Sequence, residues 1–121
     1  MERERMRRVL AEGMGWTDKD GVWHDANGQC VQNGCGHAQM VVYWDPIKNW
    51  RHAGQVIEAM RAKGWEFAMS WDNSDAVAIF GQDQGGARNE YDAMVEGATL
   101  AGVCYAICTA ACRALESEAT E

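Results

Sequence analysis

The sequence predicts a single-domain α/β protein, an α-β-α sandwich whose mostly antiparallel sheet is covered by helices on both faces. Two observations carry this prediction: residues 65–80 have the pattern of a two-faced hairpin, and residues 49–63 and 99–115 have the apolar stripes of amphipathic helices. A chain of 121 residues is long enough for one core but not for two, so we expect one domain over residues 1–121.

The hairpin is the clearest element. Residues 65–71 alternate large apolar with small or polar side chains, residues 72–75 have turn chemistry, and residues 76–80 return as a strand. The predicted cross-strand pairs are Trp71–Ala76, Met69–Ala78 and Phe67–Phe80 on one face, and Ser70–Val77 and Ala68–Ile79 on the other. Because the second face is also mostly apolar, we expect helices to cover it as well.

The N-terminal half predicts smaller elements. A helix over residues 3–12 should end at Gly13, with Trp16 just beyond it as an aromatic anchor. Residues 17–21 are typical of a turn, and residues 21–24 and 29–31 predict a small hairpin around a turn at residues 25–28. Residues 40–44 predict a strand.

Capping residues delimit the other helices. Asn49 is expected to cap the central helix, and Lys63 and Gly64 have the character of its end. Residues 82–90 predict a polar, glycine-bearing loop, and residues 91–96 a short edge strand. Thr99 is expected to cap the last helix, whose small residues allow close packing.

Charge and hydropathy exclude several classes of partner. The net charge of −7 disfavours DNA or RNA, since phosphate contacts need clustered lysine and arginine. The longest apolar run is interrupted by Thr109 and Arg113 and falls short of the roughly 20 residues of a membrane span. The first eight residues are charged throughout and carry no secretory signal, so we expect a cytoplasmic protein that does not enter a membrane.

The five cysteines suggest no disulfide framework. Cys104, Cys108 and Cys112 recur at every fourth position, which on a helix separates neighbouring Cβ atoms by about 5–6 Å. A disulfide prefers roughly 3.8 Å between these atoms. We therefore expect the three to be buried thiols in a reducing compartment.

Cys30, Cys35 and His37, with His24 nearby, form the group that most resembles a metal site. Zinc accepts such ligands at short spacings, and the alternative is an ordinary loop. The spacing lacks the usual second pair of ligands, and a glycine-rich loop loses entropy when it closes around an ion. We expect no metal and no other cofactor.

Catalytic patterns are missing from the sequence. None of its serines lies in a Gly-x-Ser-x-Gly turn, and it contains neither a Gly-x-x-x-x-Gly-Lys loop nor a His-Glu-x-x-His helix. We expect a protein that is not an enzyme and has no catalytic residue.

A nucleotide-binding interpretation rests on an aromatic plate beside polar groups. Phe80 ends a predicted strand next to the loop that carries Arg88 and Asn89, and these types could stack on a base and bind phosphate and ribose. The alternatives are a Phe67–Phe80 core pair and a solvated loop.

Three further residues are candidates for the same kind of site. Arg51 and Arg113 could contact an anion, or instead lie in solvent or interact with a helix dipole. Trp16 could line a subunit interface or belong to the core.

Three segments resemble a known family. Leu-Ala-Glu-Gly-Met-Gly-Trp at residues 10–16, Trp-Asp-Pro at 44–46 with the helix that follows, and the closing Ala-Ile-Cys helix at 106–108 are similar to motifs of the phage ABA-sandwich proteins. The resemblance implies an α-β-α sandwich. Some members look like Thoeris anti-defence proteins, homo-oligomers that capture cyclic ADP-ribose-type immune signals without cleaving them. Some also hold cyclic oligonucleotides, and Thr109 stands where an arginine often lies in that closing helix.

Two function hypotheses follow. The first is a phage anti-defence protein of the host bacterial cytoplasm that sequesters a cyclic ADP-ribose-type nucleotide as a homo-oligomer. Its ligand-binding residues would be Phe80, Arg88, Asn89, Arg51, Arg113 and Trp16. The alternative is a protein-binding adaptor or inhibitor that acts through a tryptophan-rich surface, without a small-molecule ligand.

Overall fold

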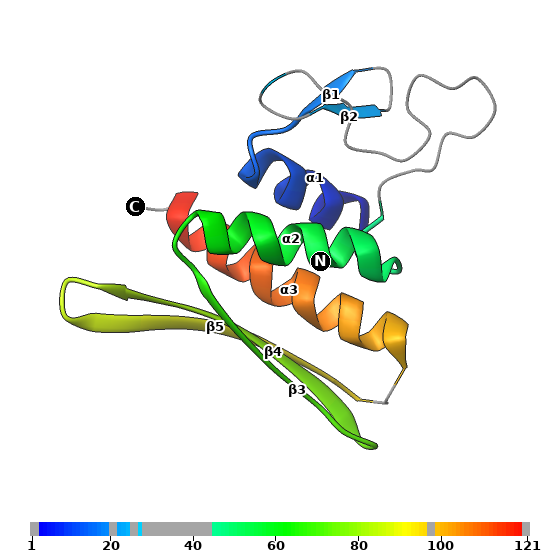
Figure 1. The fold of residues 1–121 in the computed structure, drawn as a ribbon, viewed down its shortest axis with the longest axis vertical. Coiled ribbons are helices and arrows are strands. Elements are labelled where there is room, and N and C mark those ends of the chain that lie inside the picture. The colour runs from blue at the N-terminus through cyan, green and yellow to red at the C-terminus, as the bar shows by residue number, and fades with distance from the viewer. Residues whose placement is uncertain (1–2, 20–21, 25–26, 28–44, 97–98, 120–121) are drawn as a thin grey trace.

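The computed structural model describes residues 3–19, 22–24, 27, 45–96 and 99–119. They form one α/β domain with two antiparallel sheets (Figure 1). The elements are α1 (Arg3–Gly13), β1 (Thr17–Lys19), β2 (Val22–His24), α2 (Trp50–Ala62), β3 (Glu66–Trp71), β4 (Asp75–Gln84), β5 (Ala87–Glu96) and α3 (Leu100–Ala119). The predicted α/β class is confirmed.

The larger sheet has the strand order β3-β4-β5, and all its pairs are antiparallel. The register of β3 on β4 agrees with the prediction at every pair, from Phe67 opposite Phe80 to Trp71 opposite Ala76. Asp72 closes the turn, since its Oδ1 accepts the backbone N–H groups of Ser74 and Asp75 at 2.7 and 3.0 Å. The two-residue alternation of apolar side chains was therefore sufficient to set this register.

The predicted loop over residues 82–90 is wrong. β4 continues to Gln84 and β5 begins at Ala87, so that only two residues lie between the strands. Gly85 and Gly86 occupy this turn with φ of 57° and 87°, the backbone conformation that tight hairpins require and glycine adopts readily. Both strands are polar here because they extend beyond the helices, and they therefore lack the apolar alternation of a half-buried strand.

The predicted sandwich has helices on both faces of the sheet, and the structure differs from it in this respect. α3 packs against β4 and β5 on one side and against α1 and α2 on the other, and all three helices lie on the same side of the sheet (Figure 1). α3 is buried around most of its circumference because its alanines and cysteines leave room for neighbours on every side. Within the described residues, no helix covers the second face of the sheet.

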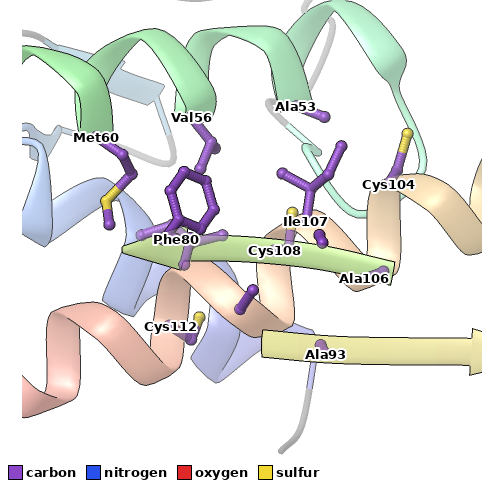
Figure 2. Packing of buried hydrophobic residues seen from close by; sticks show 14 of the residues in the cluster. Ala53, Val56, Met60, Phe80, Ala93, Cys104, Ala106, Ile107, Cys108 and Cys112 are labelled. Carbon is purple, nitrogen blue, oxygen red and sulfur yellow. The ribbon is translucent and has the colours of Figure 1, made fainter. Parts of the chain in front are cut away.

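The core lies where α2, α3 and the sheet meet. Figure 2 shows Val56 and Met60 of α2 directed toward Phe80 of β4, with Ile107 of α3 beside them. Cys104, Cys108 and Cys112 are buried in the same cluster, in agreement with the sequence. Burial raises the pKa of all three thiols, to about 12 for Cys112, because a thiolate would lose its hydration there.

The predicted helix caps are confirmed. Asn49 Oδ1 accepts the His52 backbone N–H at 3.2 Å at the start of α2, and Thr99 Oγ1 accepts that of Gly102 at 3.1 Å at the start of α3. Gly64 follows α2 with φ of 96°. The predicted end of α1 at Gly13 also agrees with the structure.

The small hairpin differs from its prediction. β2 pairs with β1, the segment that looked like a turn, in the register Asp18 opposite Trp23. The proposed partner strand at residues 29–31 lies outside the described residues, as do the predicted strand at 40–44 and Cys30, Cys35 and His37.

One described helix, α3, is long and apolar enough to cross a membrane when judged by length and composition alone. Its mean hydropathy over Leu100–Glu118 is 1.2, and 56% of the residues in that window are buried inside the fold. Since it packs against the sheet and two helices, these properties are those of a core helix.

Candidate functional site

Phe80 belongs to the core. Its side chain is fully buried beneath α2, and its ring centroid lies 5.0 Å from that of Phe67. The two rings form the cross-strand core pair that was the alternative to a stacking role. A base cannot stack on a ring that is enclosed in this way. The interpretation of Phe80 as an adenine plate therefore does not fit this structure.

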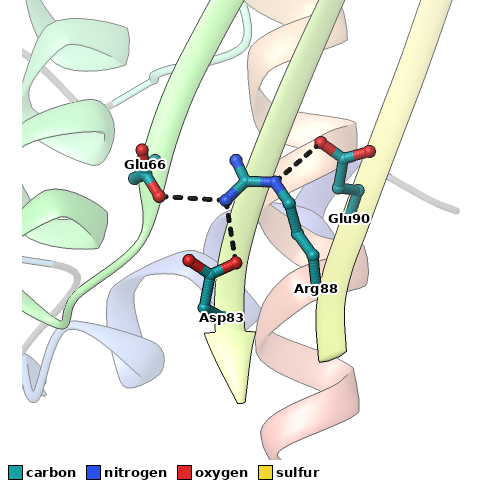
Figure 3. A network of polar contacts seen from close by, with 4 residues as sticks. All are labelled: Glu66, Asp83, Arg88 and Glu90. Carbon is teal, nitrogen blue, oxygen red and sulfur yellow. Dashed lines mark hydrogen bonds and ion pairs between the residues drawn. The ribbon is translucent and has the colours of Figure 1, made fainter. Parts of the chain in front are cut away.

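Arg88 is held by three carboxylates. Its Nη1 lies 2.9 Å from Glu66 Oε1 and 3.2 Å from Asp83 Oδ1, and its Nε lies 3.1 Å from Glu90 Oε2 (Figure 3). These hydrogen bonds raise the pKa of the guanidinium above its usual range. Gly81 makes the geometry possible, because a Cβ there would lie 2.5 Å from Arg88 Nη2. Arg88 has its charge balanced within the protein and is poorly suited to a pyrophosphate.

The other four predicted ligand-binding residues lie apart. Asn89 pairs with Gln82 near the turn of the β4–β5 hairpin. Arg51 is exposed in the first turn of α2, and Arg113 on α3 donates a hydrogen bond to the backbone oxygen of Asp92. Trp16 is half-buried against the core after α1. The six residues named from the sequence do not converge on one pocket.

A different hollow has the composition of a ligand site. It has a volume of about 380 Å³ and is lined by residues of α1, the turn before α2, the end of β5 and the start of α3: Arg3, Ile47, Lys48, Val95, Ala101, Gly102 and Tyr105. We call it the Tyr105 hollow. Its size falls in the range of small-molecule sites, roughly 300–1,000 Å³.

The lining of the Tyr105 hollow combines a ring with positive charge. Ala101 and Gly102 are small, which leaves space beside the half-buried ring of Tyr105. Arg3 and Lys48 supply two cations, and neither forms an ion pair within the described residues. An aromatic face for a base and cations for phosphate are the groups that a nucleotide requires.

Hydrogen bonds fix the turn that carries Ile47 and Lys48. The backbone N–H of Asp45 donates to His52 Nδ1 at 2.9 Å, and Asp45 Oδ1 accepts the N–H of Ile47 at 3.2 Å. Arg7 Nη1 lies 3.6 Å from Asp45 Oδ2. His52 is buried, and desolvation lowers its pKa although Asp45 opposes the shift. The neutral imidazole is thus the form that accepts this bond.

Two other hollows are larger, but the charges of the side chains that line them are less suitable for an anionic ligand. One of about 440 Å³, between the ends of α1 and α3, is lined by Glu12, Glu116 and Glu118, which repel an anion. One of about 700 Å³ between α2 and β3 sets Arg61 against Glu66. Among the hollows of the described residues, only the Tyr105 hollow has cations without a facing carboxylate in its lining.

Large apolar side chains are exposed at the diverging ends of α2 and β3. Trp50, at the start of α2, is 43% exposed. Met69 and Trp71, toward the end of β3, are 38% and 45% exposed, and we call these two residues the tryptophan surface. The two elements meet where α2 ends and β3 begins, then move apart (Figure 1). Met69 and Trp71 share the face of Phe67, and the end of β3 that carries them lies away from α2 (Figure 1).

Within the described part of the chain, no three histidine, cysteine or acidic side chains lie close enough to hold a metal ion. Since Cys30, Cys35 and His37 are outside that part, the expectation of no metal stays a prediction.

The sequence contained a signal for the Tyr105 hollow that was not used. Two small residues, Ala101 and Gly102, precede an aromatic residue on one helix, which is typical of a packing gap beside a ring. Arg3 and Lys48 could not be added from the sequence because they come from distant segments.

Comparison with known proteins gives no relative. No family model matches the chain, and neither the curated proteins nor the solved structures contain a match.

Proposed function

We propose that this protein is a non-catalytic phage anti-defence protein that captures a cyclic ADP-ribose-type signalling nucleotide in the Tyr105 hollow. The observation that carries the proposal is the pair of cations beside Tyr105, Arg3 and Lys48, which have no ion-pair partner among the described residues. The ligand class comes from the resemblance to the phage ABA-sandwich family. Arg3, Lys48 and Tyr105 take the place of the ligand-binding residues that were expected from the sequence, such as Phe80 and Arg88.

Each part of the hollow has a role in such a complex. Tyr105 would stack on the base, a contact worth roughly 1–3 kcal/mol. Arg3 and Lys48 would bind the pyrophosphate, and a bidentate contact from Arg3 would fix its orientation. Ile47 and Val95 exclude water from the apolar side of the ligand.

Capture without turnover fits the chemistry of the described side chains. The three thiols on α3 are buried and have raised pKa values, so that they are protonated and unreactive at neutral pH. The Nδ1 of His52 is occupied by the Asp45 N–H. A protein that sequesters a signal in the cytoplasm needs affinity and abundance rather than a reaction.

Native mass spectrometry with a panel of cyclic ADP-ribose isomers and cyclic oligonucleotides tests the proposal. We expect one ligand class to bind and to be recovered intact after heat denaturation. Lys48→Glu and Arg3→Glu should each weaken binding by about tenfold or more, since each removes a phosphate contact worth about 1.4 kcal/mol or more.

Arg51→Glu is the matched control, because Arg51 is exposed nearby on α2 but does not line the hollow. Its affinity should stay within about twofold of the unchanged protein. Recovery of a cleaved nucleotide would indicate an enzyme. An equal loss in the Arg51 and Lys48 variants would contradict the assignment of the hollow.

A second candidate is the protein-binding adaptor or inhibitor, favoured by the exposure of Trp50 and Trp71. Tryptophan is enriched among the residues that dominate binding energy at protein interfaces. The tryptophan surface is also the candidate contact between copies of this chain, in keeping with the expected homo-oligomer. Absence of binding to every nucleotide in the panel would favour the adaptor.

A further inference from the structure

The face of the larger sheet that points away from the helices has an apolar centre between acidic ends. The register of the three strands places the following side chains on it: Glu66, Ala68 and Ser70 of β3; Asp75, Val77, Ile79 and Asp83 of β4; and Arg88, Glu90, Asp92, Met94 and Glu96 of β5. We call this surface the open sheet face. Figure 3 shows the Arg88 network lying over the strands with the helices behind them.

The centre of the open sheet face is apolar and accessible. Met94 is 63% exposed, Ala68 is exposed, and Val77 and Ile79 are half-buried. Ala68, Ile79 and Gly81 form the apolar side of a hollow of about 130 Å³, and Glu66, Arg88 and Glu90 line its charged side. This volume is room for one aliphatic side chain. An antiparallel sheet with one solvated face normally presents polar residues there, so this apolar patch is unusual.

The charge of the open sheet face is strongly one-sided. It carries six carboxylates and one guanidinium, a formal charge of −5 compared with −7 for the whole chain. Arg88 is already occupied by Glu66, Asp83 and Glu90. Asp92 and Glu96 have no ion pair among the described residues.

We propose that the open sheet face is a docking surface for a partner protein that presents a basic segment with an apolar anchor residue. The anchor would enter the hollow beside Ile79, and lysine or arginine side chains would face Asp92 and Glu96. Nucleic acid and anionic lipid are disfavoured by the sign of the charge. A second copy is also disfavoured, because two such faces would repel each other.

This interface goes beyond the proposed capture of a nucleotide and uses the side of the sheet opposite to the helices. The two can be tested separately, because no residue proposed to contact the nucleotide belongs to the open sheet face.

A short amphipathic leucine–lysine peptide is a suitable probe, with a second peptide that has glutamate in place of every lysine as its control. Fluorescence anisotropy measures the affinity, and amide chemical shifts of the labelled protein locate the contact. We expect only the basic peptide to bind and to shift the amides of β4 and β5. Because charge attracts the peptide, binding should weaken as salt is raised.

The double variant Asp92→Lys/Glu96→Lys should weaken binding by about tenfold or more, because it places cations on the contact surface. Glu4→Lys/Glu58→Lys is the matched control, since it makes the same change of net charge at exposed positions on α1 and α2. Its affinity should stay within about threefold of the unchanged protein.

Three results would overturn the proposal. The basic peptide could fail to bind, or the two double variants could lose affinity equally, which would indicate attraction by net charge alone. In the Trp71→Lys variant, which removes the expected contact through the tryptophan surface, the amides of β4 and β5 could also shift with protein concentration in the absence of peptide, which would identify a second copy as the occupant.

Discussion

His52 shows how one buried side chain supports a turn that contributes to the Tyr105 hollow. The residue is 2% exposed, and its Nδ1 accepts the backbone N–H of Asp45 at 2.9 Å. Burial disfavours the charged form and lowers the pKa from its usual 6.5. Protonation would remove the acceptor and place a cation close to Asp45 but out of water.

Stability should therefore fall in mild acid. As the pH drops through the unfolded-state pKa of about 6.5, the unfolded chain takes up a proton before the folded chain does, since the folded pKa is lower. The contribution is fully present above that pH and decreases below it. Urea unfolding between pH 8 and pH 5 measures this dependence.

His52→Leu is the companion variant. It should remove the histidine contribution to the pH dependence and lower the free energy of unfolding by about 1–3 kcal/mol, because the Asp45 N–H loses its acceptor. An unchanged pH profile in this variant would show that other groups control the acid sensitivity.

At the scale of elements, glycine has opposite effects in a helix and in a turn. Gly54 lies within α2, and a Cβ added there would meet no atom within 4 Å. Gly86 lies in the β4–β5 turn with φ of 87°, where a side chain is strained.

Gly54→Ala should raise the free energy of unfolding by about 0.5–1 kcal/mol through helix propensity. Gly86→Ala should lower it by about 1–2 kcal/mol, because its φ favours glycine. Thermal or urea unfolding of the pair compares the two effects within one protein. A gain in both variants would contradict the turn geometry.

The fold was predictable where the pattern of side chains was local. The register of β3 on β4 follows from the alternation between Phe67 and Trp71, and the caps follow from Asn49 and Thr99. The polar strand ends around Asp83 and Arg88 were missed because a strand without a buried face has no apolar alternation.

The candidate site was less accessible to sequence reasoning. An apolar stripe on a helix shows that one side is buried but does not identify the neighbour, so the position of α3 between the sheet and the other helices was not apparent. Phe80 was a candidate stacking residue with the Phe67 core pair as its alternative, because alternation along a strand does not show which face the helices cover. The Tyr105 hollow is lined from three distant parts of the chain: α1, the turn before α2, and the junction of β5 with α3.

At the scale of the whole molecule, the charge and the apolar surface are distributed unevenly. The open sheet face carries most of the net negative charge, whereas Met69 and Trp71 of the tryptophan surface lie on the other face of the sheet. We expect any self-association to use the tryptophan surface, because this arrangement avoids contact between the acidic faces of two copies.

Trp71→Lys should therefore convert an oligomer into a monomer, because it places a charge within an apolar contact. Light scattering at micromolar concentration measures the mass. Met94→Lys, on the opposite face of the sheet, is the control and should leave the mass unchanged. A monomer before any substitution would contradict self-association.

The burial of Cys104, Cys108 and Cys112 along the central helix has a practical consequence. A thiol-specific reagent reaches them only when the contacts of α3 with the sheet and with the other helices have opened. Where opening and closing are fast relative to alkylation, the rate of alkylation measures the fraction of molecules in which the core is open. Alkylation of these three thiols, which lie along a single helix, therefore reports the opening of the core without an added probe.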